Sequence, residues 1–136
     1  MRKNNQTIDN SELLIDTIVS SIEEKKGTNI SILDLRSIEG TVSEYFVICE
    51  GNSKPHISAL NDFILENVRA KLKVKPFHKE GQQNMEWVLI DYSSVIVHIF
   101  NNESRNFYNL EKLWEDAKIT FIESSKQEVP NLNVYE

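Results

Sequence analysis

The sequence predicts a single α/β domain, with a mixed sheet of about five strands and helices packed on it, in the order α-β-β-α-β-β-β-α. Three observations support this prediction. The chain has 136 residues, which favours one domain with a buried core. Residues 45–49 (YFVIC) are a continuous apolar run, typical of a central strand. Apolar runs at 87–90 and 95–100 flank a short polar break, which indicates a hairpin.

The first half of the chain predicts a helix, two strands and a long second helix. Ser11 is suited to cap the first helix, and Gly27 lies near its end. Residues 30–35 (ISILDL) read as a strand that precedes the central strand. Ser53 or Lys54 then caps a helix whose apolar residues recur on one face as far as position 72. This helix looks like a crossover between two strands of the same sheet.

The second half predicts an edge strand, the hairpin and a last helix. Residues 74–78 form a short strand that Pro76, which lacks a backbone donor, demotes to an edge. If Ser93 and Ser94 alone make the hairpin turn, Trp87 lies opposite Phe100, although such turns prefer glycine. A polar link at 101–105 leads into a helix at 107–114. Residues 120–136 are expected to be a helix extension or a loose tail.

Composition limits the domain organisation and the partners. We expect a mobile N-terminus at 1–10, one domain at 11–118 and a C-terminal extension at 119–136. The formal net charge is -6, so bare nucleic acid is a poor partner overall and a basic protein is a better one. Cys49 stands alone, as a small buried hydrophobe. No apolar stretch is long enough to cross a membrane, and a cytoplasmic protein is the simplest interpretation.

Motifs for chemistry are weak. The turn at 51–53, between a strand and a helix, has one glycine and could cradle an anion, but a plain turn is the better interpretation. His56, His78 and His98 lack a familiar spacing of metal ligands. There is no GxSxG elbow, and no DxD pair to hold the metal of nucleotidyl transfer. We therefore expect no enzyme activity, no metal and no cofactor.

Four aromatic residues are more suggestive: Trp87, Phe107, Tyr108 and Trp114. Aromatic side chains beside charges often anchor protein interfaces, but these residues could equally pack the core between the hairpin and the last helix. Helical spacing favours a core position for Trp114, whereas the two interpretations of Trp87 are about equal.

Three segments, YFVICEGNSKPHI, KEGQQNMEWVLIDYSSVIVHIF and ESRNFYNLEKLW, closely resemble the ribosomal silencing factor family, also called Iojap-like proteins. The resemblance spans about residues 11–117. Ser93 and Ser94 depart from it, because the family commonly has Gly-Asp at the turn, and the tail lies beyond it. The matching positions are Gly51, Ser53, His56, Glu80, Gly81, Trp87, Asp91, Val97, His98, Tyr108, Leu110, Glu111, Leu113 and Trp114.

The resemblance implies a nucleotidyltransferase-like fold without catalytic residues, and a role without enzyme activity. Members bind the large ribosomal subunit through its protein fourteen, block joining of the small subunit and so repress translation when nutrients are scarce. Some help large-subunit assembly in organelles, and members can pair as homodimers. A large-subunit assembly factor and a nucleotide-binding enzyme that uses the 51–53 turn remain the alternatives.

The resemblance and general interface chemistry together suggest the residues of a docking surface. Trp87 is expected to be the apolar anchor, while Asp91 and Glu103 meet Lys or Arg of the partner. Arg105 is expected either to contact nearby rRNA or to orient Glu111 within the protein. The complete set of expected partner-binding residues is Trp87, Asp91, His98, Glu103, Arg105 and Tyr108.

Overall fold

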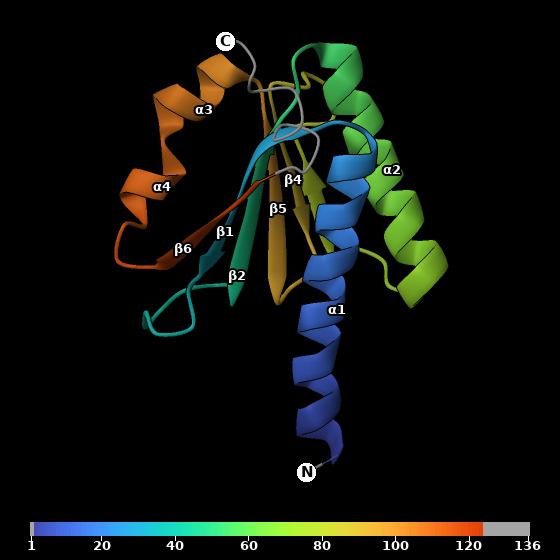
Figure 1. The fold of residues 1–136 in the computed structure, drawn as a ribbon, viewed down its shortest axis with the longest axis vertical. Coiled ribbons are helices and arrows are strands. Elements are labelled where there is room, and N and C mark those ends of the chain that lie inside the picture. Colours follow the sequence, from blue (N-terminus) through green and yellow to red (C-terminus); the bar gives the residue numbers. More distant parts are fainter. Residues whose placement is uncertain (1, 124–136) are drawn as a thin grey trace, which may run out of the picture.

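A computed structural model describes the backbone of residues 2–123 and the side chains of residues 11–123. The elements are arranged in three layers around a six-stranded mixed sheet of order β3-β4-β5-β2-β1-β6 (Figure 1). The helices are α1 (Arg2–Glu24), α2 (Lys54–Leu72), α3 (Asn102–Tyr108) and α4 (Leu110–Leu113). The strands are β1 (Thr28–Asp34), β2 (Tyr45–Glu50), β3 (His78–Glu80), β4 (Trp87–Asp91), β5 (Val95–Phe100) and β6 (Lys118–Ile122).

The predicted α/β class is confirmed, and the reason lies in the two central strands. β2 and β5 pair in parallel and have helices on both faces, so nearly every side chain on them is buried. Val47 and Val97 point into the core beneath α1 and α2, while Phe46 and Phe100 point into a second core beneath α3 and α4. The sheet therefore separates two apolar layers, and residues two apart on a strand belong to the same one.

The crossover and the hairpin are confirmed. β5 and β4 separate β2 from β3, so α2 carries the chain over two strands to the edge of the sheet. In the hairpin Trp87 lies opposite Phe100, as a turn made by Ser93 and Ser94 requires. Ser93 adopts φ 76°, and the Asp91 carboxylate accepts a hydrogen bond from its backbone N–H at 2.7 Å. This side-chain bond offsets the missing glycine.

Two predicted boundaries are wrong. The first helix begins at Arg2, so Ser11 lies buried within it and is not its cap. The edge strand is β3 and not 74–78, because Pro76 cannot donate a hydrogen bond and pairing with β4 starts after it. The Phe77 N–H donates to the Asp91 carbonyl oxygen at 2.8 Å, directly before β3 begins. Mobility of residues 1–10 stays a prediction.

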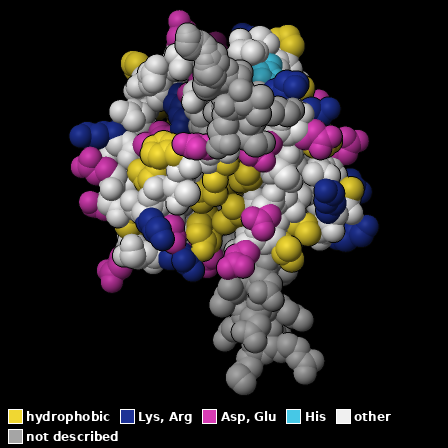
Figure 2. Space-filling model, viewed as in Figure 1, with side chains coloured by type: hydrophobic (Ala, Val, Ile, Leu, Met, Phe, Trp, Pro, Cys, Tyr) yellow, Lys and Arg dark blue, Asp and Glu magenta, His cyan; other side chains and the backbone are white. Residues whose placement is uncertain are grey.

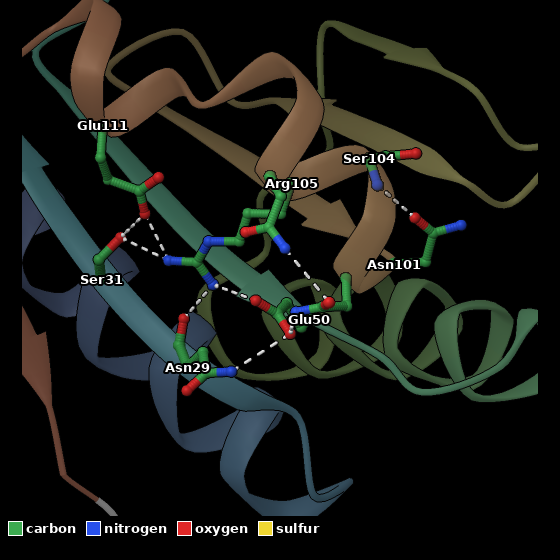
Figure 3. Close-up of polar contacts among 9 residues, drawn as sticks. Asn29, Ser31, Glu50, Asn101, Ser104, Arg105 and Glu111 are labelled. Carbon is green, nitrogen blue, oxygen red and sulfur yellow. Dashed lines mark hydrogen bonds and ion pairs between the residues drawn. The ribbon is translucent and has the colours of Figure 1, made fainter.

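The predicted last helix is two helices. Asn101 caps α3 by accepting from the Ser104 N–H at 2.7 Å, so the expected polar link is helical (Figure 3). Asn109 ends α3 in the left-handed conformation, and its side chain accepts from the Lys112 N–H to cap α4. The sequence signal for this break was the pair Asn101 and Asn109. Each side chain accepts from the backbone N–H three residues further on, as a helix N-cap does.

The sixth strand was also missed. β6 pairs antiparallel with β1 at residues that were expected to extend the helix or to form a tail. The segment KITFI is short, but its β-branched residues fit a strand. Its partner lies far away in the sequence, so no local signal reported the pairing. The rest of the expected tail, 124–136, lies outside the described residues, and the domain boundary at 118 stays a prediction.

Two glycines test whether the chain passes too close to Gly81 for a side chain to fit there. Gly81 and Gly40 have nearly equal positive φ, +85° and +82°. A Cβ on Gly81 would lie 2.0 Å from the Trp87 carbonyl oxygen, whereas a Cβ on Gly40 would meet nothing within 4 Å. We expect Gly40→Ala to cost about 1 kcal/mol of unfolding free energy, and Gly81→Ala roughly 3 kcal/mol more, because the chain must also move. Urea unfolding measures both, and equal losses would contradict the close approach.

Candidate protein-binding site

Arg105 ties α3 to the sheet and to α4 (Figure 3). Its side chain is buried, and its Nη1 donates to the Glu50 carboxylate at 3.3 Å and to the Asn29 carbonyl oxygen. Its Nη2 donates to the Glu111 carboxylate and to Ser31 Oγ, the latter at 3.3 Å. These partners come from β1, β2 and α4, so one guanidinium holds four elements together. This is the internal role that was one of the two expected for Arg105.

The network holds two carboxylates against one guanidinium. Burial by itself would raise the pKa of Glu111, but the hydrogen bond and charge of Arg105, with a further bond from Ser31 Oγ at 2.9 Å, outweigh it and lower that pKa. Glu50 also accepts hydrogen bonds from the side-chain amides of Asn29, at 3.2 Å, and Asn102. Both carboxylates therefore keep hydrogen-bond partners although they are largely buried.

Aromatic rings form a stack that rises from the sheet to the surface. The Trp87 ring lies on that of Phe100, with centroids 5.0 Å apart, and Tyr108 lies 4.6 Å from Trp87. Phe107 packs edge-on against Tyr108 at 5.0 Å. Phe107 is 80% exposed, Tyr108 49% and, on α4, Leu113 70%. We call the exposed side chains of Phe107, Tyr108 and Leu113 the apolar platform.

His98 supports this stack from inside the sheet. The Trp87 Nε1–H donates to His98 Nδ1 at 3.1 Å, so His98 carries its proton on Nε2. That Nε2 is buried and has no hydrogen-bond partner among the described residues. Burial lowers the pKa of His98 to about 3, against a small opposing effect of Glu111. His98 is therefore a neutral structural residue that fixes the orientation of Trp87.

The structure brings together only some of the expected site residues. Trp87, His98 and Tyr108 lie in one stack, and Arg105 holds the helix that carries Tyr108. Glu103 is exposed in the first turn of the same helix. Asp91 lies at the far end of β4 from Trp87, where it caps the hairpin turn.

Phe107, which could have been an interface anchor or a core residue, is exposed, and so is Leu113 in the helix predicted at 107–114. The break at Asn109 changes the direction of the chain, so Leu110 is the buried residue of α4 and Leu113 points outward. Trp114 packs edge-on against Phe46 at 5.9 Å, in agreement with the favoured core position. The capping asparagines could have revealed this change of phase.

The turn at 51–53 caps α2, in agreement with the favoured interpretation of a plain turn. The Asn52 N–H donates to His56 Nδ1 at 3.0 Å. The His56 N–H donates to Ser53 Oγ at 3.1 Å. The Gly51 N–H donates to the Phe100 carbonyl oxygen, and a Cβ there would lie 2.7 Å from the Ile57 side chain. Packing therefore explains the glycine, and these backbone donors are already used.

Within the described part of the chain, no three His, Cys, Asp or Glu residues gather as metal ligands would. None of its helices is both long and apolar enough to cross a bilayer. Cys49 is fully buried, which raises the pKa of its thiol to about 12.

The fold and the site together define a three-layer α/β domain that exposes an aromatic, partly acidic surface, which is typical of a protein that binds another protein. The sequence matches the family described as "Ribosomal silencing factor during starvation" over residues 8–134. The chain therefore belongs to the ribosomal silencing factor family.

Individual proteins agree with this assignment. The chain is 35% identical to the ribosomal silencing factor of Halalkalibacterium halodurans over 84% of this chain and 95% of that one. It is 30% identical to "Mitochondrial assembly of ribosomal large subunit protein 1" of Mus musculus, over 74% of this chain but 44% of that longer protein. A crystal structure from Chromobacterium violaceum shares the fold, with a TM-score of 0.73 and 24% identity over 84% and 93% of the two chains.

The buried ion pairs predict the effect of removing Arg105. Arg105→Met leaves two carboxylates without their cation, and we expect a loss of roughly 3–5 kcal/mol in unfolding free energy. Adding Glu50→Gln and Glu111→Gln is expected to recover part of that loss, because no unpaired charge remains. Urea unfolding at neutral pH measures both proteins. A triple variant less stable than Arg105→Met would contradict the electrostatic explanation.

His98 predicts how stability depends on pH. Its pKa is about 3 in the folded protein and near 6.5 when unfolded, so between these values only the unfolded chain is protonated. Stability from this group is complete above pH 6.5 and falls as the pH drops toward 3. Between pH 6.5 and 5 we expect a loss of about 2 kcal/mol. His98→Leu is expected to remove that part of the slope, and identical slopes in urea unfolding would contradict the burial of a neutral His98.

Proposed function

We propose that this protein binds the large ribosomal subunit, chiefly through its protein fourteen, and sterically blocks joining of the small subunit, which represses translation when nutrients are scarce. One observation carries the proposal: a member of the ribosomal silencing factor family exposes an apolar platform of Phe107, Tyr108 and Leu113. Large exposed aromatic groups supply most of the binding energy at many protein interfaces. The protein acts in the cytoplasm, where the subunits meet.

The construction of the platform suits docking without rearrangement. Arg105 fixes α3 on the sheet, and Trp87 supports the Tyr108 ring from beneath. Helix α3 and the Tyr108 ring are therefore already held in place before a partner binds, so less conformational entropy is lost on binding. A body of 15.8 kDa on the joining face needs no chemistry, because the volume that it occupies excludes the small subunit.

The expected partner-binding residues divide into two kinds. Tyr108 and Trp87 provide the apolar anchor, and Glu103 meets a Lys or Arg of the partner at the border of the platform. Asp91 contributes only if the interface extends to the far end of β4. His98 and Arg105 are positioning residues: one orients Trp87 and the other holds α3. Minor rRNA contacts and a homodimer through an edge strand remain parts of the proposal.

A role in large-subunit assembly is the second candidate. The mouse relative, 30% identical, carries that role in its name, "Mitochondrial assembly of ribosomal large subunit protein 1". The same platform would serve it, but an assembly factor binds immature large subunits better than mature ones. Sedimentation with both kinds of particle distinguishes the two functions.

Co-sedimentation with purified ribosomal subunits tests the proposed function. We expect the wild-type protein to pellet with the large subunit, not with the small one, and to reduce the yield of joined ribosomes. Phe107→Ala/Leu113→Ala is expected to weaken pelleting tenfold or more, since two buried contacts are worth about 1.4 kcal/mol or more at an interface.

Leu13→Ala/Val42→Ala is the matched control, because these two side chains are also exposed and apolar but lie on α1 and in the loop before β2. This control is expected to bind like the wild type. If the wild type pellets with neither subunit, the proposed function is wrong. If both double variants lose binding equally, the platform is not the interface.

A further inference from the structure

Residues 69–79 form a basic segment in an acidic chain. The segment, RAKLKVKPFHK, holds five Lys or Arg residues and no carboxylate, whereas the whole chain has a formal net charge of -6. It comprises the last turn of α2, the link and the start of β3. The five cations are Arg69, Lys71, Lys73, Lys75 and Lys79, and all of them are exposed. None of the salt bridges among residues 11–123 includes one of these five residues.

The basic segment forms one side of an open groove along the C-terminal half of α2. The groove has a volume of about 1160 Å³ and an apolar floor that includes Leu65, Val74 and Pro76. Two carboxylates, Asp62 and Glu66, lie at its α2 side. Four of its lining residues are cations, Arg69, Lys73, Lys75 and Lys79. In Figure 2 the dark blue side chains at the right of the view lie at this end of α2.

A stabilising effect on α2 explains only some of the cations in the basic segment. Arg69 and Lys71 lie in the last turn of α2, where cations interact favourably with the helix dipole. Lys75 and Lys79 lie beyond the helix, in the link and in β3, where the dipole no longer acts. Their charges add mutual repulsion without an ion pair in return. Such a cluster is typical of a site for a polyanion.

Phe77 lies between Lys75 and Lys79 in the sequence, outside the lining of the groove, and its ring is in solvent. Its side chain is 81% exposed, while its backbone N–H is fixed by the bond to the Asp91 carbonyl oxygen. An exposed aromatic ring beside a line of cations is the arrangement on which an unstacked base lies while its phosphates are neutralised. A duplex cannot use the ring, because its bases are already stacked.

We propose that the basic segment binds single-stranded RNA, with phosphates on Lys73, Lys75 and Lys79 and one base stacked on Phe77. The inference does not depend on the proposed function, because it concerns α2 and the β3 edge, whereas the apolar platform is on the opposite face of the sheet. One molecule can therefore hold an RNA strand and a protein partner at once.

Fluorescence anisotropy with a labelled, unstructured 12-nucleotide RNA tests this site on the full chain. We expect binding at low salt that weakens as salt rises, with a log–log slope of about -2 for three phosphates on a single strand. Lys73→Glu/Lys75→Glu/Lys79→Glu is expected to lose tenfold or more in affinity. Phe77→Ala is expected to lose about fivefold or more, while Phe77→Trp keeps the affinity.

Lys26→Glu/Lys54→Glu/Lys118→Glu is the matched control, because it changes the net charge equally at exposed lysines outside the groove. It is expected to stay within twofold of the wild type. Equal losses in the two triple variants would overturn the site, since net charge alone would then explain them. No binding at 50 mM salt, or equal affinity for a duplex of the same length, would also overturn the proposal. Circular dichroism confirms that each variant is folded.

Discussion

The hydrogen bonds and ion pairs of the buried Arg105 guanidinium are the interaction on which the face with α3 and α4 depends. α3 and α4 are short, and neither would be stable by itself. Arg105 joins them to β1 and β2 through Asn29, Ser31, Glu50 and Glu111. A buried ion pair often adds little net stability, but it accepts only one geometry. Here that geometry fixes the helices that carry the apolar platform.

The two faces of the sheet do different work. The face under α1 and α2 is packed almost entirely with aliphatic side chains, which makes it the main source of stability. The face under α3 and α4 holds the polar and aromatic groups: Glu50 and His98 on strands, and Trp87 beneath Tyr108. The candidate binding residues therefore lie on the face of the sheet whose core is less purely aliphatic and holds more hydrogen-bonded polar groups.

Some residues of the expected interface lie together because strand register fixes their positions. Trp87 and His98 follow from the hairpin, in which alternation places them on one face. The exposure of Leu113 did not follow, because the break at Asn109 separates two helices that the apolar spacing joined into one. The net charge of the whole chain likewise gave no sign of the basic segment. An overall charge of -6 does not report how the charges are distributed, and here five cations lie within eleven consecutive residues.

The sequence by itself determined the α/β class, the central strand at 45–49, the crossover helix and the presence of the hairpin, because these depend on local periodicity. The hairpin register was conditional on a two-residue turn at 93–94, and the structure decided it. The sequence also carried the motifs by which the family is recognised. Only the tertiary structure decided that KITFI completes the sheet as β6, that Arg105 lies inside with two carboxylates, and which aromatic rings remain in solvent. Those outcomes depend on contacts between residues far apart in the chain, and local patterns do not report such contacts.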